Sequence, residues 1–109
     1  MRSLERHTEA AVVQYANSIG IRSYKMNGTG HRSMPDRLFL IPYNKVVFIE
    51  FKRAGEVCTT LQLLKIAELR ANGFTVEVVE DRYVGMRLLY DALVAKRISE
   101  DVDTLPSTA

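Results

Sequence analysis

The feature that most constrains the fold is a run of four apolar residues, Val-Val-Phe-Ile at positions 46–49, that leads directly into Glu50-Phe51-Lys52. A strand that is apolar on both faces belongs in the middle of a sheet, where other elements cover it on each side. Because side chains alternate along a strand, Glu50 and Lys52 share one face there and Phe51 points to the other. Charged groups are costly to bury unpaired, so the two at the end of this strand need a structural or functional reason.

The rest of the chain predicts helices and strands on both sides of this central strand. Apolar spacing and capping residues predict a first helix from a Ser3 cap to about residue 18, a helix that begins after Thr59 or Thr60 and ends at Asn72, and a last helix over 83–98. Residues 21–26, 38–41 and 74–79 read as strands. The expected order is therefore α-β-β-β-α-β with a C-terminal helix, an α/β fold with a small mixed sheet. We expect one domain over residues 1–98 and a polar, acidic, frayed tail over 99–109.

Length and composition are those of an ordinary globular domain. The chain has 109 residues, 47% of them hydrophobic and 26% charged, which excludes a disordered tail, a collagen-like chain and a disulfide scaffold. No apolar run approaches the ~18–20 residues of a membrane span, and none near the start resembles a signal-peptide core. The single cysteine, Cys58, fits a reducing compartment. We therefore expect a cytoplasmic protein without membrane contact.

The charge is unevenly distributed along the chain. Residues 20–53 hold seven basic side chains and two acidic ones, a net of +5, whereas the remainder is net negative. Such asymmetry indicates a polyanionic partner, although a solvated basic surface without any partner explains it equally well. The two acids in this basic stretch, Asp36 and Glu50, both belong to a recognisable pattern.

Asp36 and Glu50 are expected to lie on two strands joined as a hairpin near residues 43–45. They share a face only if the loop has an odd number of residues or a bulge restores the phase. A three-residue loop that pairs Pro42 with Val46 would set Asp36 opposite Lys52. Two carboxylates with a backbone carbonyl form a hard-oxygen site suited to Mg²⁺ or Mn²⁺, and a nearby lysine could orient water for phosphodiester hydrolysis. A salt bridge on a strand rim is the alternative, and it would be preferred for Glu-x-Lys without the preceding Pro-Asp.

These motifs resemble the virus-type replication–repair nuclease (VRR-NUC) domain, a branch of the PD-(D/E)xK nucleases with the restriction-endonuclease-like fold. The resemblance extends over roughly residues 5–80. One departure is the loop before Pro-Asp-Arg, which is longer here than in the family pattern because residues 31–34 follow Gly30. The residues that carry it are Glu9, Lys25, Gly28-Thr29-Gly30, Pro35-Asp36-Arg37, Glu50-Phe51-Lys52, Gln62 and Asn72-Gly73.

The resemblance implies a role for each matching residue. Asp36 and Glu50 would bind Mg²⁺ or Mn²⁺ with the backbone carbonyl of Phe51, and Lys52 would be the catalytic lysine. Glu9 would serve a second metal position or act through water, and Gln62 would orient the attacking water or Lys52. For Arg37, a structural salt bridge and a phosphate contact are equally open. The residues expected to contact DNA are Lys25, His31, Arg32 and Arg53, with a solvated loop as the alternative for His31 and Arg32.

The implied function is a metal-dependent, structure-specific DNA endonuclease. Small free-standing members of this family act on four-way junctions as homodimers and are often encoded by phages, which predicts a Holliday junction resolvase-like enzyme in a bacterial host cytoplasm. A flap or single-strand-directed nuclease and a catalytically silent DNA-binding module remain alternatives. The loop over residues 27–30 is too short for a P-loop and lacks its lysine, so no nucleotide cofactor is expected.

Overall fold

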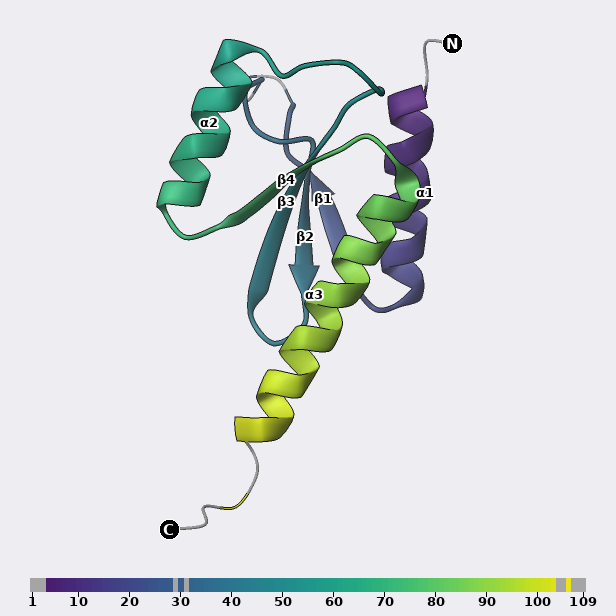
Figure 1. The fold of residues 1–109 in the computed structure, drawn as a ribbon, viewed down its shortest axis with the longest axis vertical. Coiled ribbons are helices and arrows are strands. Elements are labelled where there is room, and N and C mark those ends of the chain that lie inside the picture. The colour runs from purple at the N-terminus through teal and green to yellow at the C-terminus, as the bar shows by residue number, and fades with distance from the viewer. Residues whose placement is uncertain (1–3, 29, 31, 104–105, 107–109) are drawn as a thin grey trace.

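The computed structural model describes residues 4–28, 30, 32–103 and 106, and its elements follow the predicted order (Figure 1). They are α1 (Leu4–Ser18), β1 (Arg22–Lys25), β2 (Arg37–Ile41), β3 (Lys45–Phe51), α2 (Thr60–Ala71), β4 (Thr75–Val79) and α3 (Arg82–Asp103). Within the described ranges, no helix is both long enough and apolar enough to cross a membrane. The predicted Ser3 cap lies outside the described residues.

The four strands form one mixed sheet in the order β1-β2-β3-β4. The first three are antiparallel neighbours, and β3 pairs with β4 in parallel. Helices α1 and α3 cover one face, over a core that includes Phe39, Ile49 and Leu89. Helix α2 covers part of the other face, where Phe48 and Ile66 meet. Strand β3 is therefore central and covered on both sides, as its apolar run predicts, and the expected α/β fold is confirmed.

The loop between β2 and β3 has the odd length that a shared carboxylate face requires. Ile41 pairs with Lys45, which leaves residues 42–44 as the loop. Tyr43 and Asn44 both adopt left-handed backbone conformations, with φ of 69° and 73°, which tightens the turn. The predicted pairing of Pro42 with Val46 is therefore wrong by two residues, because the turn begins one residue earlier. Arg37 pairs with Ile49, so Asp36 lies level with Glu50 instead of Lys52, and its face is unchanged.

Helix α3 is longer than the sequence pattern predicts. It continues to Asp103 instead of ending at residue 98, so the expectation of a frayed tail is wrong for residues 99–103. This segment contains neither glycine nor proline, and Pro106 is the first helix breaker beyond it. Residues 104–105 and 107–109 lie outside the described part of the chain. On helix α2, Ile66 and Leu69 are buried, whereas Leu61 and Leu64 are exposed.

Gly85 lets α3 approach α1 closely. A Cβ atom added there would lie 2.8 Å from Cγ2 of Val12 and 3.3 Å from Cγ1 of Val79. We expect Gly85→Ala to lower the free energy of unfolding by about 1–3 kcal/mol through overpacking, even though alanine has the higher helix propensity. Urea denaturation measures this change. Gly28→Ala is the matched control, since its Cβ would meet open space, and equal stability of the two variants would refute the packing explanation.

Candidate active site

The carboxyl-terminal end of β3 and the start of β2 bring Asp36, Glu50 and Lys52 to one cavity of about 280 Å³. Glu50 and Lys52 are only 4% and 7% exposed, and Lys52 Nζ lies 3.5 Å from Glu50 Oε2. The backbone N–H of Lys52 donates to the carbonyl of Val79 (3.0 Å), which extends the parallel pairing of β3 and β4 beyond Phe51. The central strand therefore fixes both charged side chains in the buried interior.

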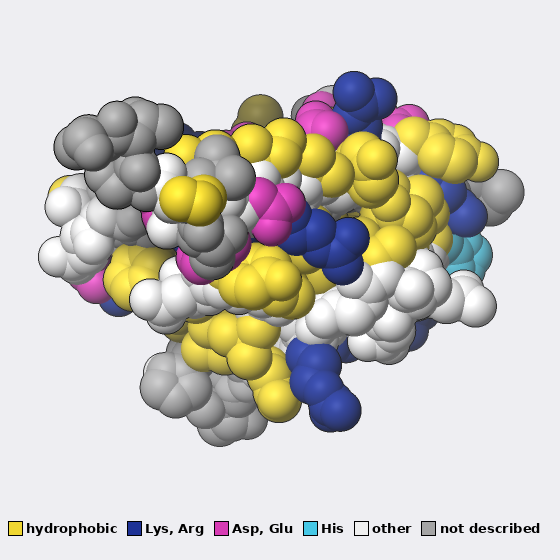
Figure 2. Space-filling view, turned by 90° about the horizontal axis from the view of Figure 1, so that it is seen from below, with side chains coloured by type: hydrophobic (Ala, Val, Ile, Leu, Met, Phe, Trp, Pro, Cys, Tyr) yellow, Lys and Arg dark blue, Asp and Glu magenta, His cyan; other side chains and the backbone are white. Residues whose placement is uncertain are grey.

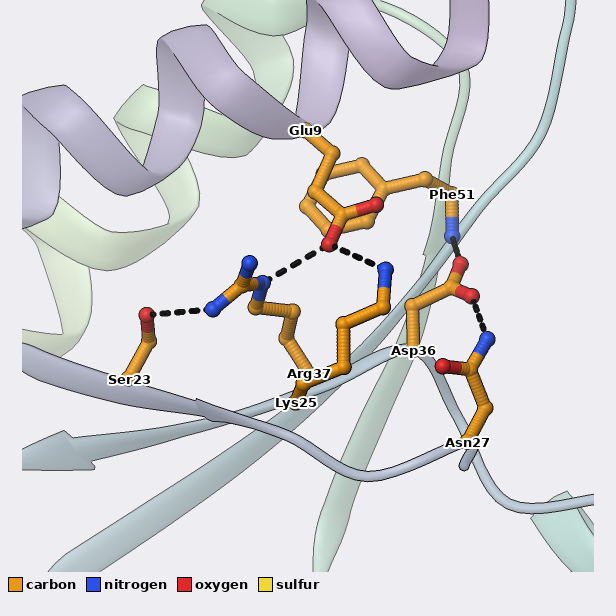
Figure 3. Close-up of polar contacts among 7 residues, drawn as sticks. All are labelled: Glu9, Ser23, Lys25, Asn27, Asp36, Arg37 and Phe51. Carbon is orange, nitrogen blue, oxygen red and sulfur yellow. Dashed lines mark hydrogen bonds and ion pairs between the residues drawn. The ribbon is translucent and has the colours of Figure 1, made fainter. Parts of the chain in front are cut away.

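Both oxygens of the Asp36 carboxylate are held by neighbouring donors (Figure 3). Oδ2 accepts a hydrogen bond from the backbone N–H of Phe51 at 2.7 Å, and Oδ1 accepts one from the side-chain amide of Asn27. Burial raises the pKa of Asp36 and the Phe51 N–H opposes this rise, while the nearby charges of Glu9 and Lys25 raise and lower it respectively. The orientation of this carboxylate is thus set before any ligand binds.

The buried position of Glu50 strongly perturbs its ionisation. Burial raises its pKa to about 7, the negative charge of Asp36 adds to the rise, and Lys52 opposes it. Its Oε2 also accepts a hydrogen bond from Nε2 of Gln62 (3.2 Å). Two carboxylates that repel each other in a buried setting form a favourable environment for a cation.

This donor set fits a hard divalent cation. Asp36 and Glu50 supply carboxylate oxygens, and Phe51, which follows Glu50 on β3, lines the same cavity and offers its backbone carbonyl. Mg²⁺ and Mn²⁺ prefer such oxygen ligands, with water in the remaining positions. Among the residues that the structure describes, no three acidic, histidine or cysteine side chains converge as a metal-binding group. The fit is therefore to a site with two protein carboxylates.

Gln62 links the site to the start of α2. Its side-chain Oε1 accepts from the backbone N–H of Thr59 (2.9 Å), and its own backbone N–H donates to Thr59 Oγ1 (3.1 Å), which completes a capping box. Nε2 of the same side chain donates to Glu50. The Gln62 amide therefore both caps the start of α2 and orients the buried carboxylate. Gln62 thus lies beside the end of β3, where its contact is with Glu50. Orientation of Lys52 or of a water molecule by Gln62 stays a prediction.

Glu9 reaches the same cavity from α1, and it forms two ion pairs there (Figure 3). Its carboxylate is buried, and Oε2 accepts from Arg37 Nε at 2.7 Å and from Lys25 Nζ at 3.1 Å. Arg37 also reaches Ser23 Oγ at 3.4 Å. Of the two alternatives for Arg37, the structure therefore favours the salt bridge.

The residues predicted to contact DNA lie in different settings. Lys25 is half-exposed and pairs with Glu9, and Arg53 is exposed beside the cavity, where its backbone N–H donates to Glu56 Oε1 (3.0 Å). Arg32 is exposed in the loop that leads to β2. His31 lies outside the described residues, so its predicted contact is not described.

Sequence reasoning missed several residues of the site. Asn27 gave no signal, because its contact with Asp36 depends on how the chain turns after β1. Glu5, Arg6 and Glu56 line the same cavity, and burial raises the pKa of Glu5 with Glu56 beside it adding to the rise. The sequence does hold a signal for Glu5, since it lies one helical turn before Glu9 on the same side of the helix.

Comparison with known proteins places the chain in a family. No family model matches the sequence. The chain is 38% identical over 80 residues, 73% of its length and 82% of the relative, to "Putative nuclease p44" of Acyrthosiphon pisum secondary endosymbiont phage 1. It also superposes on a solved "VRR_NUC domain" with a TM-score of 0.71 and 22% identity, covering 79% of this chain and 94% of that one. The chain therefore has the fold of the VRR_NUC domain, and it belongs to the same family as the phage protein "Putative nuclease p44".

Proposed function

We propose that this protein is a metal-dependent DNA endonuclease that hydrolyses phosphodiesters in branched DNA. The observation that carries the proposal is the convergence of Asp36, Glu50 and Lys52 on one cavity at the end of the central strand. The similarity to a phage nuclease and to the VRR_NUC fold supports a nuclease that acts on DNA. A half-buried single thiol, Cys58, suits the reducing cytoplasm of a bacterial host, which we propose as the site of action.

In the proposed reaction, Asp36, Glu50 and the Phe51 carbonyl would hold Mg²⁺ or Mn²⁺. When bound, the ion supplies charge neutralisation for the phosphate and the leaving oxygen and makes water a better nucleophile. Lys52, whose ammonium enters the same cavity, would orient the attacking water or neutralise charge in the transition state. Gln62 would keep Glu50 in place through its amide.

DNA recognition would rest on phosphates and backbone shape. Basic side chains can neutralise phosphates without reading bases. We propose this role for Lys25, which lines the cavity, and for His31, Arg32 and Arg53. Among branched substrates, a four-way junction is favoured because its two-fold symmetry matches a two-fold dimer that cuts two strands.

The proposed homodimer has a candidate surface on α3. This helix extends beyond the sheet (Figure 1), and Ile98 and Val102 on its overhanging part are 57% and 58% exposed. Figure 2 looks onto this end of the molecule and shows hydrophobic side chains exposed among basic ones. Sedimentation measures the mass, and a monomer at the concentration of the cleavage assay would overturn the dimer.

Cleavage of a labelled four-way junction tests the proposed function. With Mn²⁺ or Mg²⁺, we expect paired symmetric nicks from the wild type, whereas Lys52→Ala should bind the junction and cut it at least about 100-fold more slowly, the loss typical of removing one transition-state donor. Matched flap and duplex substrates are cut in parallel. Preferential flap cleavage would replace the resolvase assignment with a flap nuclease, and binding without cleavage by the wild type would favour the silent DNA-binding module.

A further inference from the structure

The ion pairs of Glu9 place an ammonium group beside the proposed metal site. Glu9 is 8% exposed, so its charge requires compensation within the protein. Arg37 Nε and Lys25 Nζ both donate to its Oε2. These two cations differ in their freedom, because the Arg37 side chain is 24% exposed and the Lys25 side chain is 54% exposed. Arg37 is the fixed partner, and Lys25 is the cation that reaches the cavity.

Lys25 extends toward the space between Glu9 and Asp36 (Figure 3). It lines the same cavity as Glu9, Asp36 and Glu50. A metal ion bound between the carboxylates of Glu9 and Asp36 would have to occupy the space into which the Lys25 ammonium points. The ammonium thus already supplies positive charge beside Asp36.

The charges around the cavity leave a small excess of carboxylates. Five carboxylates face four cationic side chains: Glu5, Glu9, Asp36, Glu50 and Glu56 face Arg6, Lys25, Lys52 and the Glu9 partner Arg37. One divalent ion adds two positive charges, enough to attract and neutralise a phosphate diester. A second divalent ion beside Lys25 would bring like charges together in a partly buried site, which is unfavourable.

We propose that the Lys25 ammonium takes the place of a second metal ion between Glu9 and Asp36, so that the site binds one divalent cation. This inference rests on the proposed metal-dependent function and specifies its cation content. Glu9 then serves as the anchor of Lys25 and Arg37, and direct metal binding at Glu9 becomes available only when Lys25 is neutralised or displaced.

The test is the number of Mn²⁺ ions bound per chain, measured by calorimetry and by electron paramagnetic resonance on the full chain without DNA. We expect one ion for the wild type and two for Lys25→Met, in which the side chain keeps its length and loses its charge. Lys25→Arg should remain at one ion. Adding Glu9→Gln to Lys25→Met should return the count to one, because it removes the carboxylate that would hold the second ion.

Lys65→Met is the matched control, since Lys65 pairs with Glu68 on α2 at 3.0 Å and does not line the cavity. It should bind one ion. Two ions in the wild type, or one ion in a folded Lys25→Met protein, would overturn the role of Lys25 while leaving a nuclease that cuts junctions intact. A wild type that binds no Mn²⁺ and cuts no DNA would overturn the proposed function together with this inference. Circular dichroism establishes that each variant is folded.

Discussion

Asp36→Asn is expected to lower the rate of phosphodiester cleavage by about a thousandfold or more, an effect of roughly 4 kcal/mol on the activation barrier. The substitution removes one of the two carboxylates of the proposed metal site and preserves the shape of the side chain. The asparagine oxygen can still accept from the Phe51 N–H, and Asn27 can turn its amide to match the new group. The fold should therefore survive while the site loses half of its carboxylate charge.

Two measurements separate loss of the metal from loss of DNA binding. Calorimetric titration should show Mn²⁺ affinity reduced at least about 100-fold, which is more than the loss caused by changing a residue that only contacts a metal ligand. A junction-binding assay without metal should show little change in DNA affinity. Asp91→Asn is the control, because Asp91 pairs with Arg87 on the exposed side of α3. Cleavage by Asp36→Asn at a rate near that of the wild type would contradict the assignment of Asp36 as a metal ligand.

The stability of the metal-free protein is expected to fall as pH rises from about 5 to 8. The pKa of Glu50 is about 7 in the folded chain, above its ordinary value of 4.5, because burial and Asp36 disfavour the charged form. Between these two values the folded state binds more protons than the unfolded state, so the free energy of unfolding decreases with pH. The contribution of Glu50 over this window is about 2 kcal/mol, and Asp36, whose pKa is also raised, changes stability in the same direction.

Glu50→Gln isolates this contribution. Urea denaturation in EDTA at pH 5 and pH 8 should show a difference between the two pH values that is about 2 kcal/mol smaller in the variant than in the wild type. Glu68→Gln changes an exposed acid on α2 and should leave the difference unaltered. Equal pH dependence of the wild type and Glu50→Gln would show that Glu50 titrates near its ordinary pKa and that the site is more solvated than the structure indicates.

The central part of the fold follows from local sequence patterns. The apolar run before Glu50 requires burial on both faces, and this alone predicts a central strand with helices on each side. Strand alternation also predicts that Glu50 and Lys52 share a face. These features depend on neighbours in the chain, so periodicity determines them. The end of α3 was missed for a related reason: a polar helix surface and a polar tail have the same composition, and residues 99–103 lack a residue that breaks a helix.

The candidate site was predicted only in part. Asp36, Glu50 and Lys52 could be brought together from the parity of one hairpin, but their pairing was wrong by two residues because the exact start of the turn depends on left-handed conformations at Tyr43 and Asn44. No periodic pattern in the sequence predicts the contact of Asn27 with Asp36.

The sequence by itself thus determined the order of elements, the central strand and the identity of the acids and the lysine at its end, because backbone geometry imposes these on residues close together in the chain. Only the tertiary structure decided the partners of those side chains. Glu9 pairs with residues 16 and 28 positions away, and Gln62 reaches Glu50 from the next helix. Such contacts depend on how helices pack against the sheet, and the ionisation of Glu50 depends on the burial that this packing creates.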